Sequence, residues 1–172
     1  NLMSGYVANA EAPARVIDRD AGGMYLNLGD VCFYLEPEKG VKDFYWRSRD
    51  SALLIRGGAN YAYEQINAEL TAWAATHYAT AEVEVSVIGL RVESEHEDNC
   101  LATIEFRGDA AQKMPMADDA PEAAAAFVAA ARAAVSKGAK PDRARFAPIP
   151  KNFKGAVLVP ELVSTWKAAL GL

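Results

Sequence analysis

The sequence is poor in the features that mark several common classes of protein. Its two cysteines, Cys32 and Cys100, give neither a disulfide framework nor metal-ligand spacing, and we expect both to be small buried hydrophobic residues. No stretch approaches the ~20 consecutive apolar residues that a membrane span needs. No signal peptide, internal repeat or low-complexity linker is visible.

Basic residues are outnumbered by acidic ones, 18 against 23, which gives a net charge of −5. The clustered lysines and arginines of a nucleic-acid surface are therefore not expected. Hydrophobic residues make up 51% of the 172 positions, so the chain can bury the core of one domain, with or without a small appendage. The start at Asn1 rather than Met fits an organellar protein after presequence removal, a proteolytic piece or an incomplete sequence, and the compartment stays unknown.

The first part of the chain predicts an extended arm over residues 1–14, followed by a small antiparallel β unit. Aromatic and β-branched residues dominate that unit, as a half-buried pleated surface favours. A turn is expected at residues 20–23 and a break in the strands at residues 36–40, around Pro37. The expected strands cover residues 15–18, 24–27, 28–35 and 41–47.

The rest of the chain predicts alternating helices and strands. Apolar residues recur at three- and four-residue steps from about Tyr61 to Tyr78, which predicts a helix. Asp119 and Glu122 form a capping-box pattern for a second helix that Gly138 would end. The expected elements are strands at residues 52–55, 81–92, 99–107 and 141–147, and helices at residues 61–78, 120–137 and 160–170.

These elements define an α+β protein: an antiparallel β unit, then a small mixed sheet with about three helices. We place the domain boundary between residues 1–49 and 50–172. The acidic run at residues 93–98 invites a metal hypothesis, but such a run on a hairpin tip favours a solvated loop. We expect no metal ligands there, and we expect His77 to be a helix-end residue rather than a catalyst.

Three segments, in order, resemble motifs of adenylate-forming enzymes, the superfamily of acyl-CoA synthetases and peptide-synthetase adenylation domains. Residues 25–30 (YLNLGD) resemble Trp-x-x-Thr-Gly-Asp, which ends that family's large domain. Residues 48–67 resemble the hinge and first helix of its small C-terminal domain, including Gly-Gly-x-Asn. Residues 149–162 resemble its final motif, Pro-Arg-Thr-x-x-Gly-Lys-Ile-x-Arg-x-x-Leu. The order of strands and helices also matches that small domain.

The resemblance implies nucleotide positions in this sequence. By position, Asp30 and Arg49 correspond to the pair that holds the ATP ribose hydroxyls, and Gly57 and Gly58 correspond to hinge-region nucleotide or CoA positions. We expect these four positions to be vestigial. Without the family, a lone Gly-Asp at this point indicates only an ordinary turn.

The departures from the family pattern bear on catalysis. The lysine that carries the family's first half-reaction, by bridging the acyl carboxylate and the α-phosphate, is replaced by Ala156. Lys154 lies two residues earlier, roughly 6–7 Å away if the segment is extended, and we do not assign it the role. Leu28 replaces a threonine, Ala52 a hinge Asp or Lys, Tyr63 a proline and Val159 a basic residue. Nothing before residue 48 resembles a phosphate-binding loop.

Two functions from different classes follow from these observations. In the first, the chain is a non-catalytic, acyl-CoA-synthetase-like structural or interaction subunit with no catalytic residue, cofactor or metal. Its protein partner would dock on the arm and β unit of residues 1–47. In the alternative, the chain is the C-terminal fragment of an ATP-dependent acyl-CoA or acyl-acid ligase that uses ATP, Mg²⁺ and CoA, with Ala156 natural or engineered.

Overall fold

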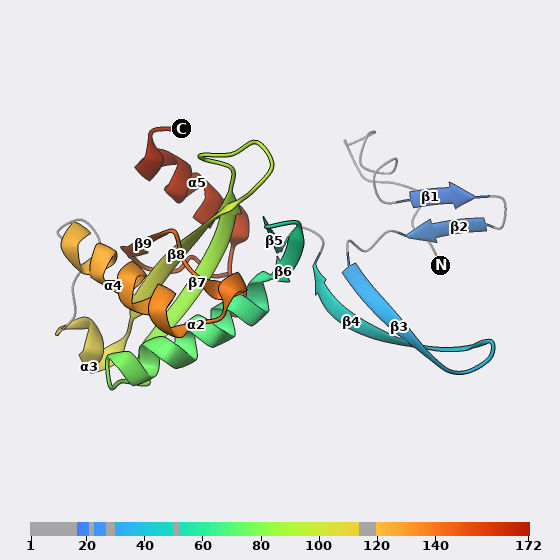
Figure 1. Cartoon of the computed structure of the whole chain (residues 1–172), viewed down its shortest axis with the longest axis horizontal. Helices are drawn as coiled ribbons and strands as arrows, with labels where there is room; N and C mark the ends of the chain where they lie inside the picture. The colour runs from blue at the N-terminus through green and yellow to red at the C-terminus, as the bar shows by residue number, and fades with distance from the viewer. Residues whose placement is uncertain (1–16, 21–22, 27–29, 50–51, 114–119) are drawn as a thin grey trace. The chain divides into compact units, whose positions relative to one another are not determined.

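The computed structural model describes residues 17–20, 23–26, 30–49, 52–113 and 120–172, and the account of the fold is confined to them (Figure 1). The chain divides into two compact units, residues 1–51 and residues 52–172. The boundary between the units falls next to Ala52, which the sequence resemblance matches to a hinge position. Each unit is described by itself.

The first unit contains two antiparallel hairpins. One pairs β1 (Ile17–Asp20) with β2 (Gly23–Leu26), and the other pairs β3 (Asp30–Glu38) with β4 (Val41–Arg49). The predicted break at residues 36–40 is wrong in its extent, because β3 continues through Pro37 to Glu38. A register shift between Leu35 and Glu38 accommodates the proline, as expected for a residue without an N–H at the edge of a ladder. The predicted arm, residues 1–14, lies outside the described residues.

The side chains of the β3–β4 hairpin are exposed from residue 32 to residue 45. Phe33 stacks on Tyr45 with ring centroids 5.2 Å apart, and Tyr34 lies against Phe44 at 5.8 Å. These two pairs are adjacent along the strands, so they occupy opposite faces of the hairpin. Cys32 is exposed as well, so the prediction that both cysteines are buried is wrong for Cys32 and confirmed for Cys100.

The second unit combines a short hairpin, a three-stranded sheet and four α-helices. The hairpin precedes α2, and the sheet has the order β7-β8-β9 with β7 and β8 antiparallel and β8 and β9 parallel. The fold is therefore α+β with a small mixed sheet, as the sequence predicts. Its elements are β5 (Leu53–Arg56), β6 (Ala59–Ala62), α2 (Tyr63–His77), β7 (Val83–Leu90), β8 (Asn99–Phe106), α3 (Gly108–Ala111), α4 (Pro121–Ala134), β9 (Arg143–Phe146) and α5 (Val159–Leu170).

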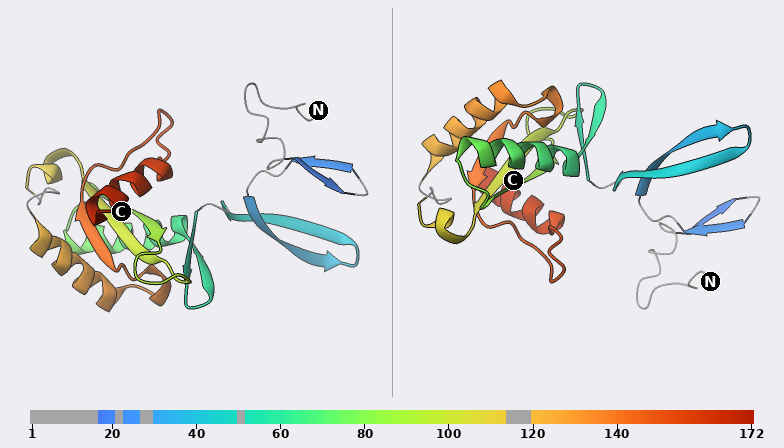
Figure 2. Two further views of the ribbon diagram at one scale, coloured as in Figure 1. Left: turned by 90° about the horizontal axis from the view of Figure 1, so that it is seen from above. Right: turned by 90° about the horizontal axis from the view of Figure 1, so that it is seen from below.

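Helices cover both faces of this sheet (Figure 2). One face packs against α2 and α4, through alternate strand residues such as Val85 and Val87 and the helix residues Leu70 and Phe127. The other face packs against α5, which buries Leu162 and Trp166. Burial of these side chains is the main stabilising term of the unit, since each contributes about 1.5–3 kcal/mol of transfer free energy.

The ends of α4 differ from the prediction. The helix begins at Pro121 after the N-cap residue Ala120, which makes no side-chain cap hydrogen bond. Asp119, on which the predicted capping box depends, lies outside the described residues. The helix ends at Ala134, three residues earlier than expected. Gly138 instead lies in a 3₁₀ turn (Lys137–Ala139), where an added Cβ would meet the ring of Tyr61 at 2.3 Å. Close packing against an aromatic ring, rather than helix termination, explains the glycine.

Within the described residues, no helix combines the length and the apolar character that crossing a membrane requires.

Candidate functional site

The two residues predicted for the ATP ribose lie opposite each other in the first unit. Asp30 begins β3 and Arg49 ends β4, and the two are cross-strand partners at the open end of the hairpin. Asp30 is half-buried. Cross-strand partners have Cβ atoms about 5 Å apart, so the register brings this predicted pair together.

The predicted glycine pair forms the turn between β5 and β6 in the second unit. Gly57 has φ +57° and Gly58 has φ +73°, and the turn joins the paired residues Arg56 and Ala59. Two consecutive residues with positive φ are typical of a type I′ turn, which matches the twist of a two-residue hairpin. The requirement for positive φ explains the two glycines without a ligand.

Two acidic side chains hold this turn in place. The Gly57 N–H donates to Glu97 Oε1 at 3.1 Å, and the Ile55 N–H donates to Asp98 Oδ2 at 2.9 Å. The Asp98 N–H donates in turn to the Ile55 carbonyl at 2.8 Å. Part of the acidic run at residues 93–98 therefore fastens the β5–β6 hairpin to the β7–β8 connection.

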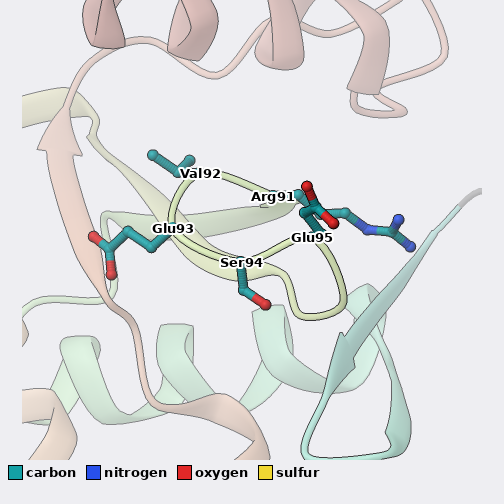
Figure 3. Close-up of a pocket in the computed structure, with 5 residues that line it drawn as sticks. All are labelled: Arg91, Val92, Glu93, Ser94 and Glu95. Carbon is teal, nitrogen blue, oxygen red and sulfur yellow. The ribbon is translucent and has the colours of Figure 1, made fainter.

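The remainder of the acidic run borders a hollow of about 500 Å³ lined by residues 91–95. The side chains of Glu93, Ser94 and Glu95 point in different directions around it (Figure 3). Across the described part of the chain, no group of three or more His, Cys, Asp or Glu residues is placed to hold a metal ion. His96 is exposed, and its N–H donates to Ser94 Oγ at 3.1 Å, a contact within the loop itself.

Sequence reasoning missed a second fastening of the same hairpin, centred on Asp142. Arg56, immediately before the glycine pair, donates to the Lys140 carbonyl at 2.7 Å and to the Asp142 carboxylate. Arg132 also reaches Asp142, at 2.9 Å, and the Cys100 N–H donates to Asp142 Oδ2 at 2.8 Å. These residues are 10 to 86 positions apart in the chain, so no local motif could have revealed the network.

Ala156, which the sequence resemblance matches to an adenylation lysine, lies in a tight loop rather than in an extended segment. An isolated antiparallel bridge between Lys151 and Val157 closes the loop. Asn152 Oδ1 accepts hydrogen bonds from the N–H groups of Lys154 at 2.9 Å and Ala156 at 3.0 Å. The Asn152 N–H donates to the Ala156 carbonyl at 2.9 Å. The loop is well organised, but it presents a methyl group at position 156.

Neither lysine of this loop is placed to do what an adenylation lysine at position 156 would do. Lys151 Nζ lies 2.6 Å from the Glu84 carboxylate, which anchors it to β7. Lys154 Nζ lies 5.5 Å from the ring centroid of Phe153, a residue that is 93% exposed. The assumed extended spacing between Lys154 and Ala156 is wrong, because Gly155 has φ +81° and turns the chain between them.

Comparison with known proteins gives a match of fold. No family model and no curated protein matches the sequence. Among solved structures, ATP-bound MatB from Rhodopseudomonas palustris matches 95% of this chain at 22% identity with a TM-score of 0.59. Amide bond synthetase McbA from Marinactinospora thermotolerans matches 95% at 23% identity with a TM-score of 0.55. The Mycobacterium tuberculosis fatty acyl CoA synthetase matches 92% at 21% identity with a TM-score of 0.51.

These matches define the class of fold. The chain has the fold of the corresponding part of adenylate-forming enzymes, and the likeness fits the C-terminal-domain-like piece that the motifs predict. The chain spans little more than a quarter of the structures that it matches: 28% of MatB, 29% of McbA and 27% of the fatty acyl CoA synthetase. The likeness therefore concerns a part of such enzymes, and their chemistry is a separate question.

Proposed function

We propose that this chain is a non-catalytic, acyl-CoA-synthetase-like protein that serves as a structural or interaction subunit of a larger assembly. The observation that carries the proposal is Ala156. By resemblance, the family places at this position an ammonium that stabilises the charge developing during adenylation. A methyl group at the end of an ordered loop cannot supply that charge, and Asn152 holds the loop closed around it.

Nearby cations do not compensate for the missing ammonium. Lys151 is engaged by Glu84, and Lys154 projects with exposed Phe153 from the turn. Loss of one preorganised charge contact of this kind costs on the order of 10²–10³ in rate. Contacts from Asp30 and Arg49 to the ribose of ATP would still leave its triphosphate without backbone N–H donors. The chain by itself is therefore proposed to be a pseudoenzyme without ATP, Mg²⁺ or CoA as working cofactors.

The proposed partner surface is the β3–β4 hairpin. Six large hydrophobic side chains of this hairpin are 45–69% exposed, the highest value being that of Phe44. Among the described residues no further strand pairs with either edge of this two-stranded ribbon, and apolar side chains lie on both of its faces. Such a ribbon offers sites for strand addition or for an aromatic-rich contact. The arm of residues 1–14 is included in the proposal. The exposed residues are Phe33, Tyr34, Leu35, Val41, Phe44 and Tyr45.

The test of this function is ATP–pyrophosphate exchange with the full chain and with Ala156→Lys, using fatty and aromatic acids as substrates. We expect no exchange from either protein, because the lysine alone leaves the carboxylate and the phosphates unpositioned. Lys154→Ala is the matched control and should be equally inactive. Isothermal titration with ATP and magnesium should show no saturable binding in the micromolar range.

Exchange by the wild-type chain, exchange that appears in Ala156→Lys, or micromolar ATP binding would each contradict the proposal. Exchange by Ala156→Lys alone would show that the residue at position 156 is what prevents catalysis. It would also show that this chain itself binds the acid and the phosphates, which the large domain does in adenylate-forming enzymes.

A second candidate function is the C-terminal part of an ATP-dependent acyl-CoA or acyl-acid ligase. The observation that favours it is that the chain covers only 27–29% of the ligases and synthetases that it resembles in fold. ATP, Mg²⁺ and CoA would then act on the complete polypeptide. The size and sequence of the polypeptide in its source decide between the two: a Ser/Thr/Gly-rich phosphate loop upstream of residue 1 supports the ligase, and a presequence alone supports the subunit.

A further inference from the structure

The outer edge of the sheet in the second unit borders a long depression. The strand β9 is the last in the order β7-β8-β9, and among the described residues no strand pairs with its outer side. Figure 1 shows β9 at this edge, with α4 and α5 on either side of the sheet. Two adjoining hollows, of about 560 and 390 Å³, lie along the edge and share Pro121, Ala124, Arg143 and Ala144.

The walls of this edge groove leave room for a chain segment. On the α4 side the wall consists of small side chains, Ala124, Ala125, Val128 and Ala129, so the helix surface is shallow beside the strand. On the α5 side the groove ends against Trp166 and Leu170. An edge strand exposes alternate N–H and carbonyl groups that its own sheet does not use, and these are the groups that an added strand pairs with.

The groove carries positive charge although the chain as a whole is acidic, with a net charge of −5. Arg143 and Arg145 project from the same side of β9, because alternate residues of a strand share a face. Arg145 lies over the Trp166 ring at 5.8 Å and donates to the Thr165 carbonyl at 3.3 Å, and in the described part of the chain no carboxylate pairs with it. The Arg143 side chain meets Glu93 at 3.1 Å in an ion pair exposed on both sides, which is easily exchanged.

The other charges in the groove do not offset these arginines. Asp142 lines one hollow, but Arg56 and Arg132 already neutralise it. Glu122 lies in the first turn of α4, is exposed and lines neither hollow. Among the described residues that line the two hollows, the arginine without a carboxylate partner is therefore Arg145, on β9 itself, where an added strand would run.

Charge also decides which occupant fits. Arginines on a short edge strand are a common protection against pairing, and here they oppose pairing with a second copy. Two copies meeting edge to edge through β9 would place the arginines of one strand against those of the other, and like charges across a strand pair are destabilising. A strand with carboxylates at alternate positions would instead meet both arginines.

We propose that the β9 edge is a docking site for an extended acidic peptide segment of a partner protein, which adds to the sheet as a fourth strand. Carboxylates at alternate positions would contact Arg143 and Arg145, and the small apolar residues between them would lie against Ala124 and Val128. The site belongs to the second unit and does not depend on the proposed function of the β3–β4 hairpin.

The test is fluorescence anisotropy with the full chain and labelled eight-residue peptides that alternate Val with Glu or Val with Lys. We expect saturable binding of the Glu peptide and none of the Lys peptide. Arg145→Glu should weaken the Glu peptide by at least about tenfold, because a charge-assisted contact is replaced by repulsion. Lys137→Glu makes a comparable change of charge in the 3₁₀ turn, outside both hollows, and should leave the affinity unchanged.

Strand addition has a further signature that attraction of charges alone lacks. N-methylation of every second peptide residue removes the N–H groups on one edge of the peptide only, so one of the two methylated registers should lose binding and the other should keep it. Equal binding in both registers would overturn the proposal, as would an unchanged affinity in Arg145→Glu with an unchanged melting temperature. Absence of Glu-peptide binding up to about 1 mM, or self-association of the chain through β9 that Arg145→Glu abolishes, would also overturn it.

Discussion

At the scale of single residues, burial assigns different chemistry to groups that look alike in the sequence. Cys100 lies fully inside the core between β7 and the Asp142 network, and burial raises the pKa of its thiol from the ordinary 9.0 to about 12. Burial also raises the pKa of Tyr63, whose hydroxyl accepts a hydrogen bond from the Gly89 N–H at 2.7 Å. Both groups are therefore neutral parts of the packing at physiological pH.

The Cys100 pKa makes a prediction about alkaline stability. The unfolded chain releases the thiol proton of Cys100 near pH 9, and the folded chain releases it only near pH 12. The contribution of this group to the free energy of unfolding is therefore complete below pH 9 and is lost as the pH rises toward 12. In this window the free energy of unfolding should fall by about 1.4 kcal/mol per pH unit from this group alone. Tyr63 and Tyr78, whose pKa values are also raised by burial, add to the fall above pH 10.

Urea unfolding at about pH 8 and about pH 10 measures this effect. Cys100→Ala should be less stable at both values but should lose about 1.4 kcal/mol less between them than the wild type. Cys32→Ala is the control, since Cys32 is exposed, and should follow the wild type. A wild-type slope retained in Cys100→Ala would show that the thiol does not titrate in this way.

At the scale of elements, the β5–β6 hairpin shows what local sequence can and cannot predict. The turn itself follows from two adjacent glycines after an apolar run. The acidic loop that holds the turn comes from a distant part of the chain, and so does Asp142, the partner of Arg56. These pairings depend on the register of strands that no local pattern fixes. The acidic loop is expected to be a solvated loop, yet Glu97 and Asp98 fasten the hairpin, and no local pattern predicts that structural role.

The glycines of this turn allow a direct test of the backbone argument. Gly58 has φ +73° and no atom within 4 Å of an added Cβ, so a substitution there meets strain in the backbone rather than a clash. Gly58→Ala should lower the free energy of unfolding by about 1–2 kcal/mol. Gly58→Asn should cost clearly less, because asparagine tolerates positive φ. Equal losses in urea unfolding would instead point to a contact made at this position.

The sequence predicts the long elements better than the short ones and better than the ends of elements: β6 and α3 are not expected, and β6 includes Tyr61, where a helix is expected to begin. The helix over residues 61–78, the paired strands around the acidic loop and the last helix all occur, because long apolar periodicity reports a buried face. The predicted end of α4 is wrong because the Tyr61 ring, and not the termination of a helix, requires a glycine at position 138. The predicted break at Pro37 is wrong because a register shift between Leu35 and Glu38 accommodates a proline within the strand.

At the scale of the whole molecule, the described side chains of the two units differ in how much they bury. Both clusters of buried hydrophobic residues found in the described part of the chain lie within residues 52–172. The described side chains of residues 32–45 are all exposed, and a two-stranded hairpin is marginally stable by itself. The domain division at residues 1–49 and 50–172 therefore stays a proposal, and it can be tested by producing the two parts separately.

We predict that residues 50–172 fold alone and that residues 1–49 do not. The shorter chain should keep a cooperative thermal transition within a few degrees of the full chain, because both clusters are intact. Residues 1–49 should show no cooperative transition by circular dichroism. If residues 50–172 lose cooperativity, the first unit contributes to the fold of the second, and if they keep full affinity for the partner, the docking surface is not the β3–β4 hairpin.

Because Cys32 is exposed and Cys100 is buried, the chain can be labelled at one defined position. A maleimide fluorophore would react with Cys32 on the open β3–β4 ribbon and leave Cys100 untouched in the core, so a single dye is attached without any substitution. The dye would sit beside the aromatic pairs of that ribbon, and its emission would shift toward the blue whenever a protein surface covered them. The occupancy of the ribbon could then be followed in real time, while the Asp142 network and the sheet stay unlabelled.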